Sequence, residues 1–314
     1  MRLSGGEADC SDWSDCSVLV ITGGRDAHLE RVVRGLERAV PRPAEVVVVF
    51  MDQPDGQVPE TDLPVVVGHV NPPDGGGRLP LAEARNAAAE LATRAVLVFL
   101  DVDCIPAQDA VGRLCRTVQE HPGSLVMGTP RYLEPDWLAR GGASVGGAGS
   151  GASGPGADPD PLLRELSVLH AARAHLAEGP TQDWHLVWTL VLAVSAADHA
   201  RLGGFDTGFS GYGAEDTDYS FRARDAGLAL RHCGAEVFHQ HHGVYRPPLH
   251  HVQDIVVNAR RFRQVHGVWP MEGWLEQFED LGLVRWDREG EVLEFLRAPT
   301  EAELTAARDD RRAY

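Results

Sequence analysis

The sequence lacks any apolar run long enough to cross a membrane, and it carries little positive charge for its length. No run approaches the roughly 18 consecutive apolar residues that a transmembrane helix needs. The chain has 29 basic and 46 acidic residues, which gives a formal net charge of −17. Because nucleic acids and anionic membranes are themselves negative, this balance argues against them as main partners. A nucleotide remains a ligand to consider, since a bound divalent cation neutralises a pyrophosphate locally.

Cysteine is scarce and shows no metal-binding spacing. The five cysteines include no C-x-x-C pair and no zinc-ribbon pattern. Scattered thiols of this kind are typical of a reduced cytoplasmic protein, with a Cys10–Cys16 bridge left open as the alternative. The first sixteen residues are polar and acidic, unlike a secretory signal. We therefore expect a cytoplasmic location.

The apolar residues follow the pattern of one large α/β domain. Short β-branched runs without polar alternation are separated by helical stretches, which indicates a mainly parallel sheet covered by helices on both faces. The expected strands are 17–22, 45–50, 63–68, 95–100, 188–195 and 229–238, and the expected helices are 26–40, 81–93, 161–177, 215–227 and 255–266. Ligands of such sheets bind beyond the carboxyl ends of the strands, so the residues after each strand are the candidates for function.

Composition divides the chain into a leader, a main domain and an extension. We expect a flexible leader at 1–16, the α/β domain at 17–252 and a helical C-terminal extension at 253–314. Residues 141–160 are so rich in Gly and Ser that they cannot pack a core, which predicts a flexible loop. A lid over an acceptor and an inert insertion are equally good interpretations of this loop.

Asp101-Val102-Asp103 follows directly after the apolar run AVLVFL. Two carboxylates one residue apart at the carboxyl end of a strand can face one cleft, where they repel each other unless a cation lies between them. Asp-x-Asp is common in acidic proteins and can be an ordinary loop. Its place after a buried strand favours a site for a divalent ion that also bridges the phosphates of a ligand.

A second acidic pair, Glu215-Asp216, follows the glycine-containing segments Gly203–Asp206 and Gly211–Ala214. Glycines permit the tight turns with positive φ that bring backbone close to a ligand. Acidic residues are also favoured in the first turn of a helix by its dipole, so a purely structural role is the alternative. A carboxylate beside such a turn suits a general base that takes a proton from an incoming hydroxyl.

Four residues with three histidines, His239-Gln240-His241-His242, follow the last expected strand. Imidazole is the commonest metal ligand among side chains. We expect only one ligand here, with His239, His241 and His242 left open as candidates, and interpret most of the other histidines of the region as solvated loop residues. Sugars stack on aromatic rings, so Tyr212 and Trp184 are acceptor candidates beside Gly213, whereas Trp188 fits the core.

Taken in order, Thr22 after its strand, the helix Leu79–Ala89, FLDVD, GGFDTGFSGYGAEDTDYSFRARDAG and VFHQHH resemble the family 2 glycosyltransferases with the GT-A fold. GYGAED and the downstream His are similar to the C-terminal part of the β-1,4-galactosyltransferases. The resemblance covers about residues 17–250. It implies a Rossmann-like sheet, Mn2+ or Mg2+, a UDP-sugar donor, and inverting transfer to a hydroxyl of a glycan, small molecule or peptide.

The resemblance also assigns roles to single residues. It divides the domain into a nucleotide-sugar-binding half at 17–130 and an acceptor half with the catalytic residues at 161–252. It implies Asp216 as general base with Glu215 as its acceptor-binding neighbour. The metal ligands that it implies are Asp101, Asp103 and His239, and the donor-binding residues are Thr22, Asp52, Arg85, Asn86, Asp101, Val102 and Asp103.

The chain departs from the family pattern at three places. The usual Asp-Asp-x-Ser is replaced by Phe50-Met51-Asp52-Gln53, the galactosyltransferase Trp-Gly-Gly by Tyr212-Gly213-Ala214, and the metal-binding Met by Glu236. These changes leave the sugar, the acceptor and the ligand set open. A retaining transferase, a nucleotidyltransferase and a non-catalytic nucleotide-sugar-binding module remain alternatives.

Overall fold

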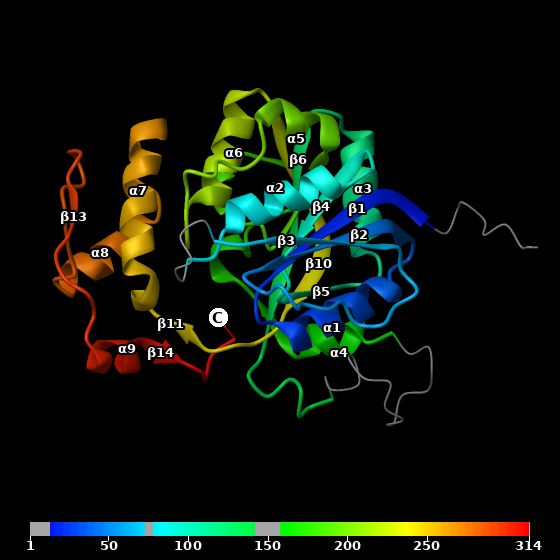
Figure 1. The fold of residues 1–314 in the computed structure, drawn as a ribbon, viewed down its shortest axis with the longest axis horizontal. Coiled ribbons are helices and arrows are strands. Elements are labelled where there is room, and N and C mark those ends of the chain that lie inside the picture. Colours follow the sequence, from blue (N-terminus) through cyan, green and yellow to red (C-terminus); the bar gives the residue numbers. More distant parts are fainter. Residues whose placement is uncertain (1–12, 73–77, 142–157, 314) are drawn as a thin grey trace, which may run out of the picture.

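A mixed ten-stranded sheet forms the centre of the computed structural model, which describes residues 13–72, 78–141 and 158–313 (Figure 1). Its first half is parallel, in the order β3 (Val65–Val70), β2 (Arg42–Met51), β1 (Trp13–Thr22), β4 (Val96–Leu100). The second half continues with β9 (Val191–Ser195), β6 (Ser124–Leu133), β10 (Ala229–His239) and β5 (Cys104–Pro106). The expected parallel sheet is thus confirmed for β3, β2, β1 and β4.

Strand β9 departs from that expectation because it runs antiparallel to both of its neighbours, β4 and β6. It begins at the edge where β6 ends, so the chain re-enters the sheet without crossing it. Short strands extend the second half: β7 (Ser167–Leu169) pairs with β6, and β8 (Gly179–Thr181) pairs with β10. The carboxyl ends of β1, β2, β4, β6 and β10 still meet at one edge of the sheet.

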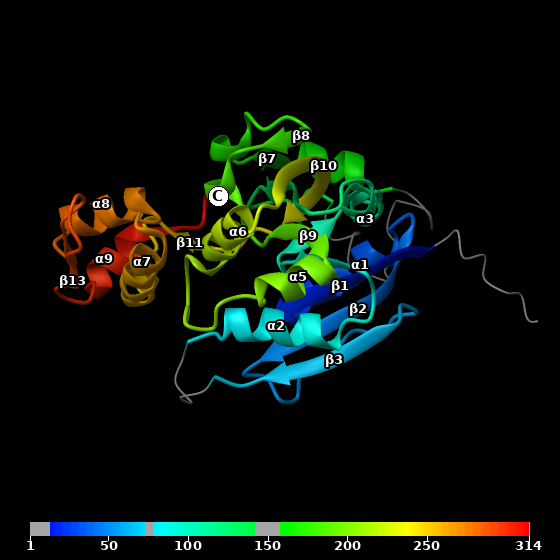
Figure 2. The ribbon, with the colours of Figure 1, turned by 90° about the horizontal axis from the view of Figure 1, so that it is seen from above.

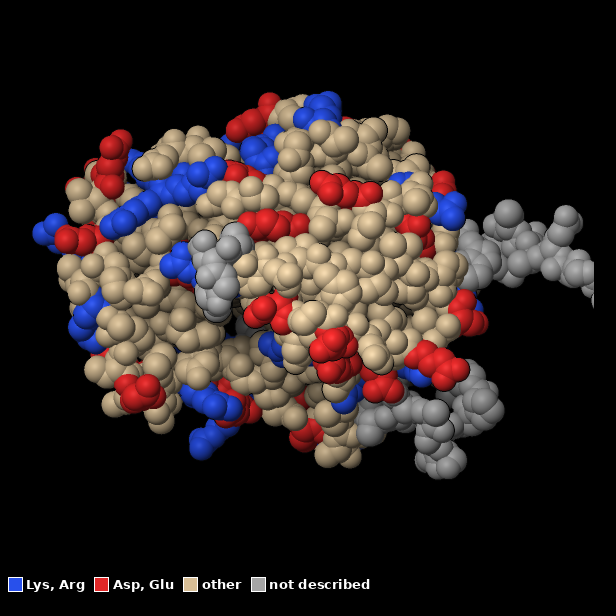
Figure 3. Space-filling model, viewed as in Figure 1, with Lys and Arg blue, Asp and Glu red and all other residues tan. Residues whose placement is uncertain are grey.

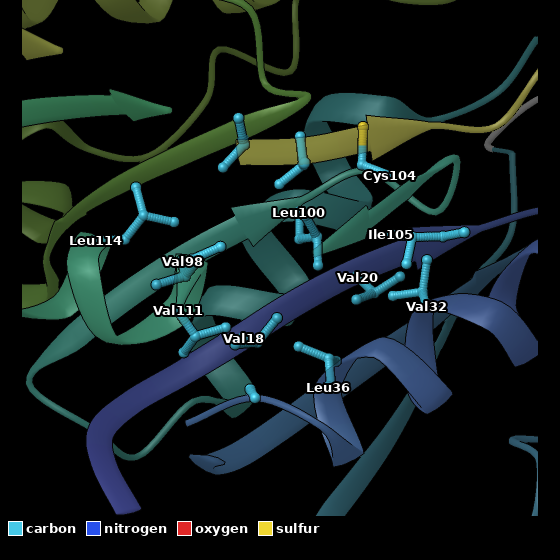
Figure 4. Close-up of a cluster of buried hydrophobic side chains, with 14 of the residues drawn as sticks. Val18, Val20, Val32, Leu36, Val98, Leu100, Cys104, Ile105, Val111 and Leu114 are labelled. Atoms are coloured by element: carbon cyan, nitrogen blue, oxygen red, sulfur yellow. The ribbon is translucent and has the colours of Figure 1, made fainter. Parts of the chain in front are cut away.

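Helices cover both faces of the sheet, as the apolar pattern predicts. Helices α1 (Asp26–Glu37) and α3 (Ala110–Glu120) cover one face, and α2 (Leu81–Leu91) and α6 (Glu215–Asp225) the other. Residues alternate along β1, so Val18 and Val20 point toward α1 and α3 while Leu19 and Ile21 point away (Figure 4). Two apolar layers therefore hold the sheet rigid beneath its carboxyl edge.

The segment between 101 and 181 differs most from expectation. No element was expected at 104–140, where β5, α3 and β6 lie. The helix expected at 161–177 is only α4 (Asp160–Glu165), followed by β7 and the 3₁₀ turn η3 (Ala171–Arg173). Strand β6 extends past its neighbours, and its free backbone pairs with 167–169 instead of leaving that segment helical. The Gly-rich loop lies largely outside the described residues, as does the leader except for its last four residues, which begin β1.

The C-terminal extension has its own core and lies beside α6 (Figure 2). It contains α7 (Val252–His266), α8 (Glu272–Asp280) and α9 (Glu301–Ala307). It is not purely helical: β12 (Val284–Trp286) and β13 (Leu293–Phe295) form a hairpin, and β14 (Arg308–Asp309) pairs with β11 (Val244–Tyr245). The β11–β14 pair joins the extension to the segment that follows β10.

Acidic and basic side chains are interspersed over the face drawn in Figure 3, so the net negative charge does not gather there into one patch. Within the described part of the chain, none of the helices is both long and apolar enough to span a membrane.

A fully buried carboxylate, Asp218, joins α6 to α7. Its two oxygens contact His266 Nε2 at 2.8 Å and Arg222 Nε at 2.8 Å. Removing one partner of a buried pair leaves the other polar groups unsatisfied. We expect Asp218→Ala to lower the free energy of unfolding by about 3–5 kcal/mol in chemical denaturation. Asp225→Ala, on the same helix but at an exposed pair with Arg224, serves as the control and should cost less than about 1 kcal/mol. Equal losses would contradict this role.

Candidate active site

The functional candidates gather at the carboxyl edge of the sheet. Thr22 ends β1, Asp52 follows β2, Asp101 and Asp103 follow β4, and His239 ends β10. Since β1, β2, β4 and β10 all finish at this edge, the prediction that post-strand residues share one site describes the structure well. Glu215 and Asp216 reach the same edge from the start of α6.

The Asp101–Asp103 segment is a tight turn between β4 and β5. The Asp101 carboxylate accepts the backbone N–H of Asp103 at 2.8 Å, and the Asp101 carbonyl accepts the N–H of Cys104 at 2.9 Å. Val102 is buried at the tip, so the turn is fixed from below. The two carboxylates consequently have different surroundings and different partners.

The Asp103 carboxylate is surrounded by cationic or hydrogen-bonding groups from three elements. Its oxygens lie 2.5 Å from His28 Nδ1, 3.2 Å from His242 Nε2 and 3.5 Å from an Arg25 nitrogen. Burial alone would raise the pKa of Asp103, but the hydrogen bonds from His242 and His28 hold it well below its ordinary value. Asp103 is therefore an anion at any neutral pH.

Asp103, His239 and His242 form the cluster in which a metal ion could be held. One ligand atom from each lies within 4.8 Å of the others. This differs from the predicted set in two ways. Asp101 is not in the cluster, because its carboxylate closes the turn, and His242 is not a solvated loop residue, because it contacts Asp103. His239 is in the cluster, as expected.

The surroundings of His239 fit a ligand. Burial lowers the pKa of this imidazole to about 4, so it is neutral and has a lone pair at neutral pH. Its Nδ1 is buried and has no hydrogen-bond partner among the described residues. The ring lies against Tyr132 with centroids 4.8 Å apart, which fixes its plane. A carboxylate and two imidazoles suit Mn2+ or a similar divalent ion.

Glu236 is not part of this cluster, although it occupies the position of a metal-binding Met in the resembling family. Its carboxylate pairs with Arg131 at 3.4 Å and with Arg164 at 2.5 Å. Both arginines therefore neutralise the Glu236 carboxylate outside the histidine cluster. The residue that joins Asp103 and His239 in the cluster is His242 and not Glu236.

Arg85 and Glu215 form a buried ion pair, with Nη1 and Oε1 at 3.0 Å. The other carboxylate oxygen of Glu215, Oε2, is buried without a partner in the described structure. Arg85 also acts on Asp101 and Asp216, since its charge lowers the pKa of both. It thus lies between the two acidic pairs and offsets their repulsion.

Asp216 has the properties of a base held at the start of a helix. Its Oδ1 accepts the backbone N–H of Thr217 at 2.7 Å. Burial, reinforced by the neighbouring Glu215 carboxylate, raises the pKa of Asp216 to about 7. A carboxylate with this pKa accepts a proton far more readily than an exposed one, and such values are typical of catalytic acids and bases.

The turn before Asp216 is held by α7. Asn258, which is fully buried, donates to the carbonyls of Ser210, Tyr212 and Gly213 at 3.1, 3.2 and 2.9 Å and accepts from Ser210 N–H. Gly213 has φ +99° and Ala214 φ +74°, the latter costly for a residue with a Cβ. The contacts of Asn258 hold this strained backbone in place at Ala214, directly before the Glu215-Asp216 pair.

Of the three aromatic candidates, Tyr212 is exposed as an acceptor contact should be, whereas Trp184 and Trp188 differ from the prediction in their burial. Tyr212 is 39% exposed at the rim and stacks on His251 with ring centroids 4.5 Å apart. Trp184, predicted to bind the acceptor, is buried in the core beneath α6, so its ring is not available to a ligand. Trp188, assigned to the core, is only half-buried.

The remaining donor-side candidates fall into two groups. Thr22 is buried at the end of β1, and its hydroxyl has no hydrogen-bond partner within the described ranges, while Asp52 is exposed with φ +51°. Asn86 instead has a structural role: its amide donates to Phe205 C=O and accepts from Phe205 N–H, both at 2.8 Å. These two bonds hold the turn after Gly204 and leave the amide one N–H and one oxygen lone pair.

Three polar residues of the site, Arg25, His28 and Arg173, escaped the sequence analysis. Arg25 and His28 contact Asp103 and follow β1, so the rule that residues after strands form the site could have found them. Arg173 could not be found in this way, because it follows no expected strand. It is 8% exposed, lies over the Trp188 ring, and has Nε and Nη1 buried without partners in the described chain. Its charge interacts with Asp216.

Comparison with known proteins gives matches along most of the domain. Residues 17–145 match the model of glycosyl transferase family 2, and residues 172–246 match a model described as the N-terminal domain of galactosyltransferase. The motif resemblance is confirmed in both places, although the second description names the N-terminal and not the C-terminal part of galactosyltransferase.

Individual relatives are more distant. The validoxylamine A glucosyltransferase of Streptomyces hygroscopicus subsp. limoneus is 28% identical over 275 residues, covering 80% of this chain and 56% of that protein. The chain therefore spans little more than half the length of this curated relative.

Two solved structures are also similar. S. aureus TarS 1–349 has a TM-score of 0.49 at 15% identity, covering 79% of this chain and 65% of that one. Mannosyltransferase PcManGT from Pyrobaculum calidifontis, in complex with GDP-Man and Mn2+, has a TM-score of 0.46 at 18% identity, covering 78% and 61%. The two family matches carry the comparison: residues 17–145 are similar to the family 2 glycosyltransferases, and residues 172–246 to a galactosyltransferase domain.

Proposed function

We propose that this chain is a metal-dependent inverting glycosyltransferase that moves a sugar from a nucleotide-sugar donor to an acceptor hydroxyl. The donor that we propose first is a UDP-sugar. The observation that carries the proposal is the meeting of two different carboxylate sites at one sheet edge. One is the Asp103–His239–His242 cluster, and the other is Asp216 with its pKa raised to about 7. The charge of Arg85 acts on Asp216 and on Asp101, the residue that begins the turn before Asp103.

Asp103, His239 and His242 would hold Mn2+ or Mg2+ next to the donor diphosphate. Such an ion supplies Lewis-acid neutralisation of the charge that develops on the leaving nucleoside diphosphate. His239 is neutral, and His242, His28 and Arg25 keep Asp103 ionised, so these two ligands are in the state that binds a cation. The contact with Asp103 raises the pKa of His242, so this imidazole would give up its proton when a cation binds. We assign Thr22, Arg25 and Asp52 to the nucleotide, because they lie at the ends of β1 and β2 on the donor side.

Asp216 takes the proton of the acceptor hydroxyl. As that oxygen forms its bond to the anomeric carbon, the bond from this carbon to the diphosphate breaks on the opposite face, which inverts the configuration. Glu215 is held by Arg85 through Oε1 and has Oε2 free to accept a hydroxyl of the acceptor. Tyr212, exposed at the rim, supplies a ring on which a sugar can stack.

The domain halves follow from this assignment. Donor binding belongs mainly to 17–130 and acceptor binding to 161–252, with α7 supporting the acceptor turn. The relative described above is named for glucosyl transfer to validoxylamine A. UDP-glucose and that acceptor are accordingly the first pair to test for metal-dependent UDP release.

Metal binding should depend on all three cluster residues. We expect calorimetry to show UDP binding with Mn2+ and little binding after chelation. Asp103→Ala, His239→Ala and His242→Ala should each weaken Mn2+ binding by at least about tenfold, since each removes one ligand. His250→Ala, at an exposed histidine outside the cluster, is the control and should bind as wild type. An unchanged His242→Ala variant would restore the single-histidine site expected from the sequence.

Replacing the base tests the acceptor side separately. Asp216→Asn retains an oxygen for Thr217 N–H but loses basicity, so transfer should fall roughly 10²–10⁴-fold while Mn2+-dependent UDP affinity remains. Because the folded pKa lies above the ordinary value of 3.8, the folded state holds this proton more tightly. Ionisation of Asp216 therefore destabilises the fold as the pH rises from 3.8 to about 7. At pH 8 the Asp216→Asn variant, whose side chain is neutral, should melt at the same temperature as wild type or higher. Turnover that falls only in step with melting temperature would make Asp216 structural.

The pH profile provides an independent measurement. Only ionised Asp216 accepts a proton, so kcat/KM for the acceptor should rise with pH to about 7 and level off above it. Arg85 lowers the pKa of Asp216, so Arg85→Met should move this rise to higher pH. Arg85→Lys keeps the charge and is the matched control. A profile that is flat between pH 5 and about 8 would refute Asp216 as the base.

A further inference from the structure

Gln240 is a buried polar residue at the metal cluster that the reaction does not use. It follows His239 directly, lies two residues before His242, and is 0% exposed. A glutamine without solvent contact is uncommon in a core and must have its amide hydrogen-bonded. Its partners therefore show what it is for.

The Gln240 amide binds main-chain and side-chain groups of two other elements. Nε2 donates to the carbonyl of His28 at 3.2 Å and, more weakly, to the carbonyl of Val102 at 3.4 Å. Oε1 accepts from Arg31 Nη1 at 3.1 Å. The backbone N–H of Gln240 donates to the carbonyl of Asp103 at 2.6 Å.

These contacts join the three pieces of chain that meet at Asp103. Helix α1 brings His28 and Arg31, the turn after β4 brings Val102 and Asp103, and the end of β10 brings His239 and Gln240 itself. The pairing of β10 with β5, in which His239 lies opposite Cys104, holds the turn against β10. The Gln240 amide joins both to α1, because it donates and accepts at once.

An apolar side chain of the same length would fill the space but could not make this connection. It would leave the His28 and Val102 carbonyls without the donor that now joins them, and α1 could move relative to the turn and β10, which stay paired through their backbones. Outer contacts of this kind orient metal ligands, and their loss typically weakens metal binding.

We propose that Gln240 is a positioning residue that holds α1, the Asp101–Asp103 turn and the end of β10 in the arrangement in which Asp103, His239 and His242 bind one cation. The inference rests on the metal site of the proposed function and adds a residue that sets its geometry. Gln240 itself does not touch the ion, the donor or the acceptor.

The test is a Mn2+ titration of the full-length chain by calorimetry, without nucleotide. Gln240→Met keeps length and volume, and we expect it to bind Mn2+ about 10–100-fold more weakly than wild type. Arg31→Met, which removes the donor to Oε1 from the surface of α1, should shift binding in the same direction by a smaller factor. If Gln240→Met does not fold, Arg31→Met alone tests whether Gln240 positions the metal ligands.

Two controls separate positioning from general stability. Ser17→Ala removes a buried hydrogen bond to Glu45 at 2.6 Å, away from the cluster, and should lower the melting temperature without changing Mn2+ affinity. His241→Ala alters the neighbouring residue, which lies outside the cluster, and should bind as wild type. Wild-type binding by Gln240→Met, or by Arg31→Met where that variant alone folds, overturns the inference and leaves the metal site standing. A wild-type chain that binds no Mn2+ overturns the metal site and the inference with it.

Discussion

Repulsion among four carboxylates at one sheet edge is the constraint around which this structure is arranged. Asp101 and Asp103 follow β4, and Glu215 and Asp216 begin α6. Burial, reinforced by the second carboxylate of each pair, raises the pKa of Asp101 to about 6 and that of Asp216 to about 7. The chain offsets this repulsion unequally. Asp103 is surrounded by imidazoles and Arg25, and Glu215 by Arg85, whereas Asp216 keeps much of its penalty.

That inequality gives one residue type two different charge environments. Asp103 is held as a permanent anion, which suits a cation ligand, while Asp216 is poised between its two protonation states, which suits proton transfer. The positions of these groups depend on elements remote in sequence. Asn258 on α7 fixes the turn before Asp216, and Gln240 after β10 joins the turn at Asp103 to α1. The C-terminal extension is thus structurally continuous with the acceptor side of the site.

The strand ends could be located from the sequence because they depend on a local pattern. AVLVFL followed by Asp-Val-Asp is buried strand followed by polar turn in any α/β sheet, and the structure has this arrangement. The histidine segment was harder, since a loop histidine and a ligand histidine look alike in sequence. His242 contacts Asp103 only because β10 lies beside β5 and directs the next residues back over the turn. Trp184 and Trp188 were misassigned for a similar reason. They lie around a 3₁₀ turn (Trp184–Leu186), where neither helical nor strand periodicity tells which side is buried.

The sequence by itself determined the α/β class, the parallel donor half and the identity of the two acidic pairs, because each depends on a run of adjacent residues. Only the tertiary structure decided which side chains share a charge environment. The Arg85–Glu215 pair spans 130 positions and the His28–Asp103 contact spans 75, and no local pattern encodes such separations. Electrostatic energy depends on distance in space and on burial, both of which are set when the sheet brings its strand ends together. The chemistry of each carboxylate is therefore a property of the fold, although its presence is a property of the sequence.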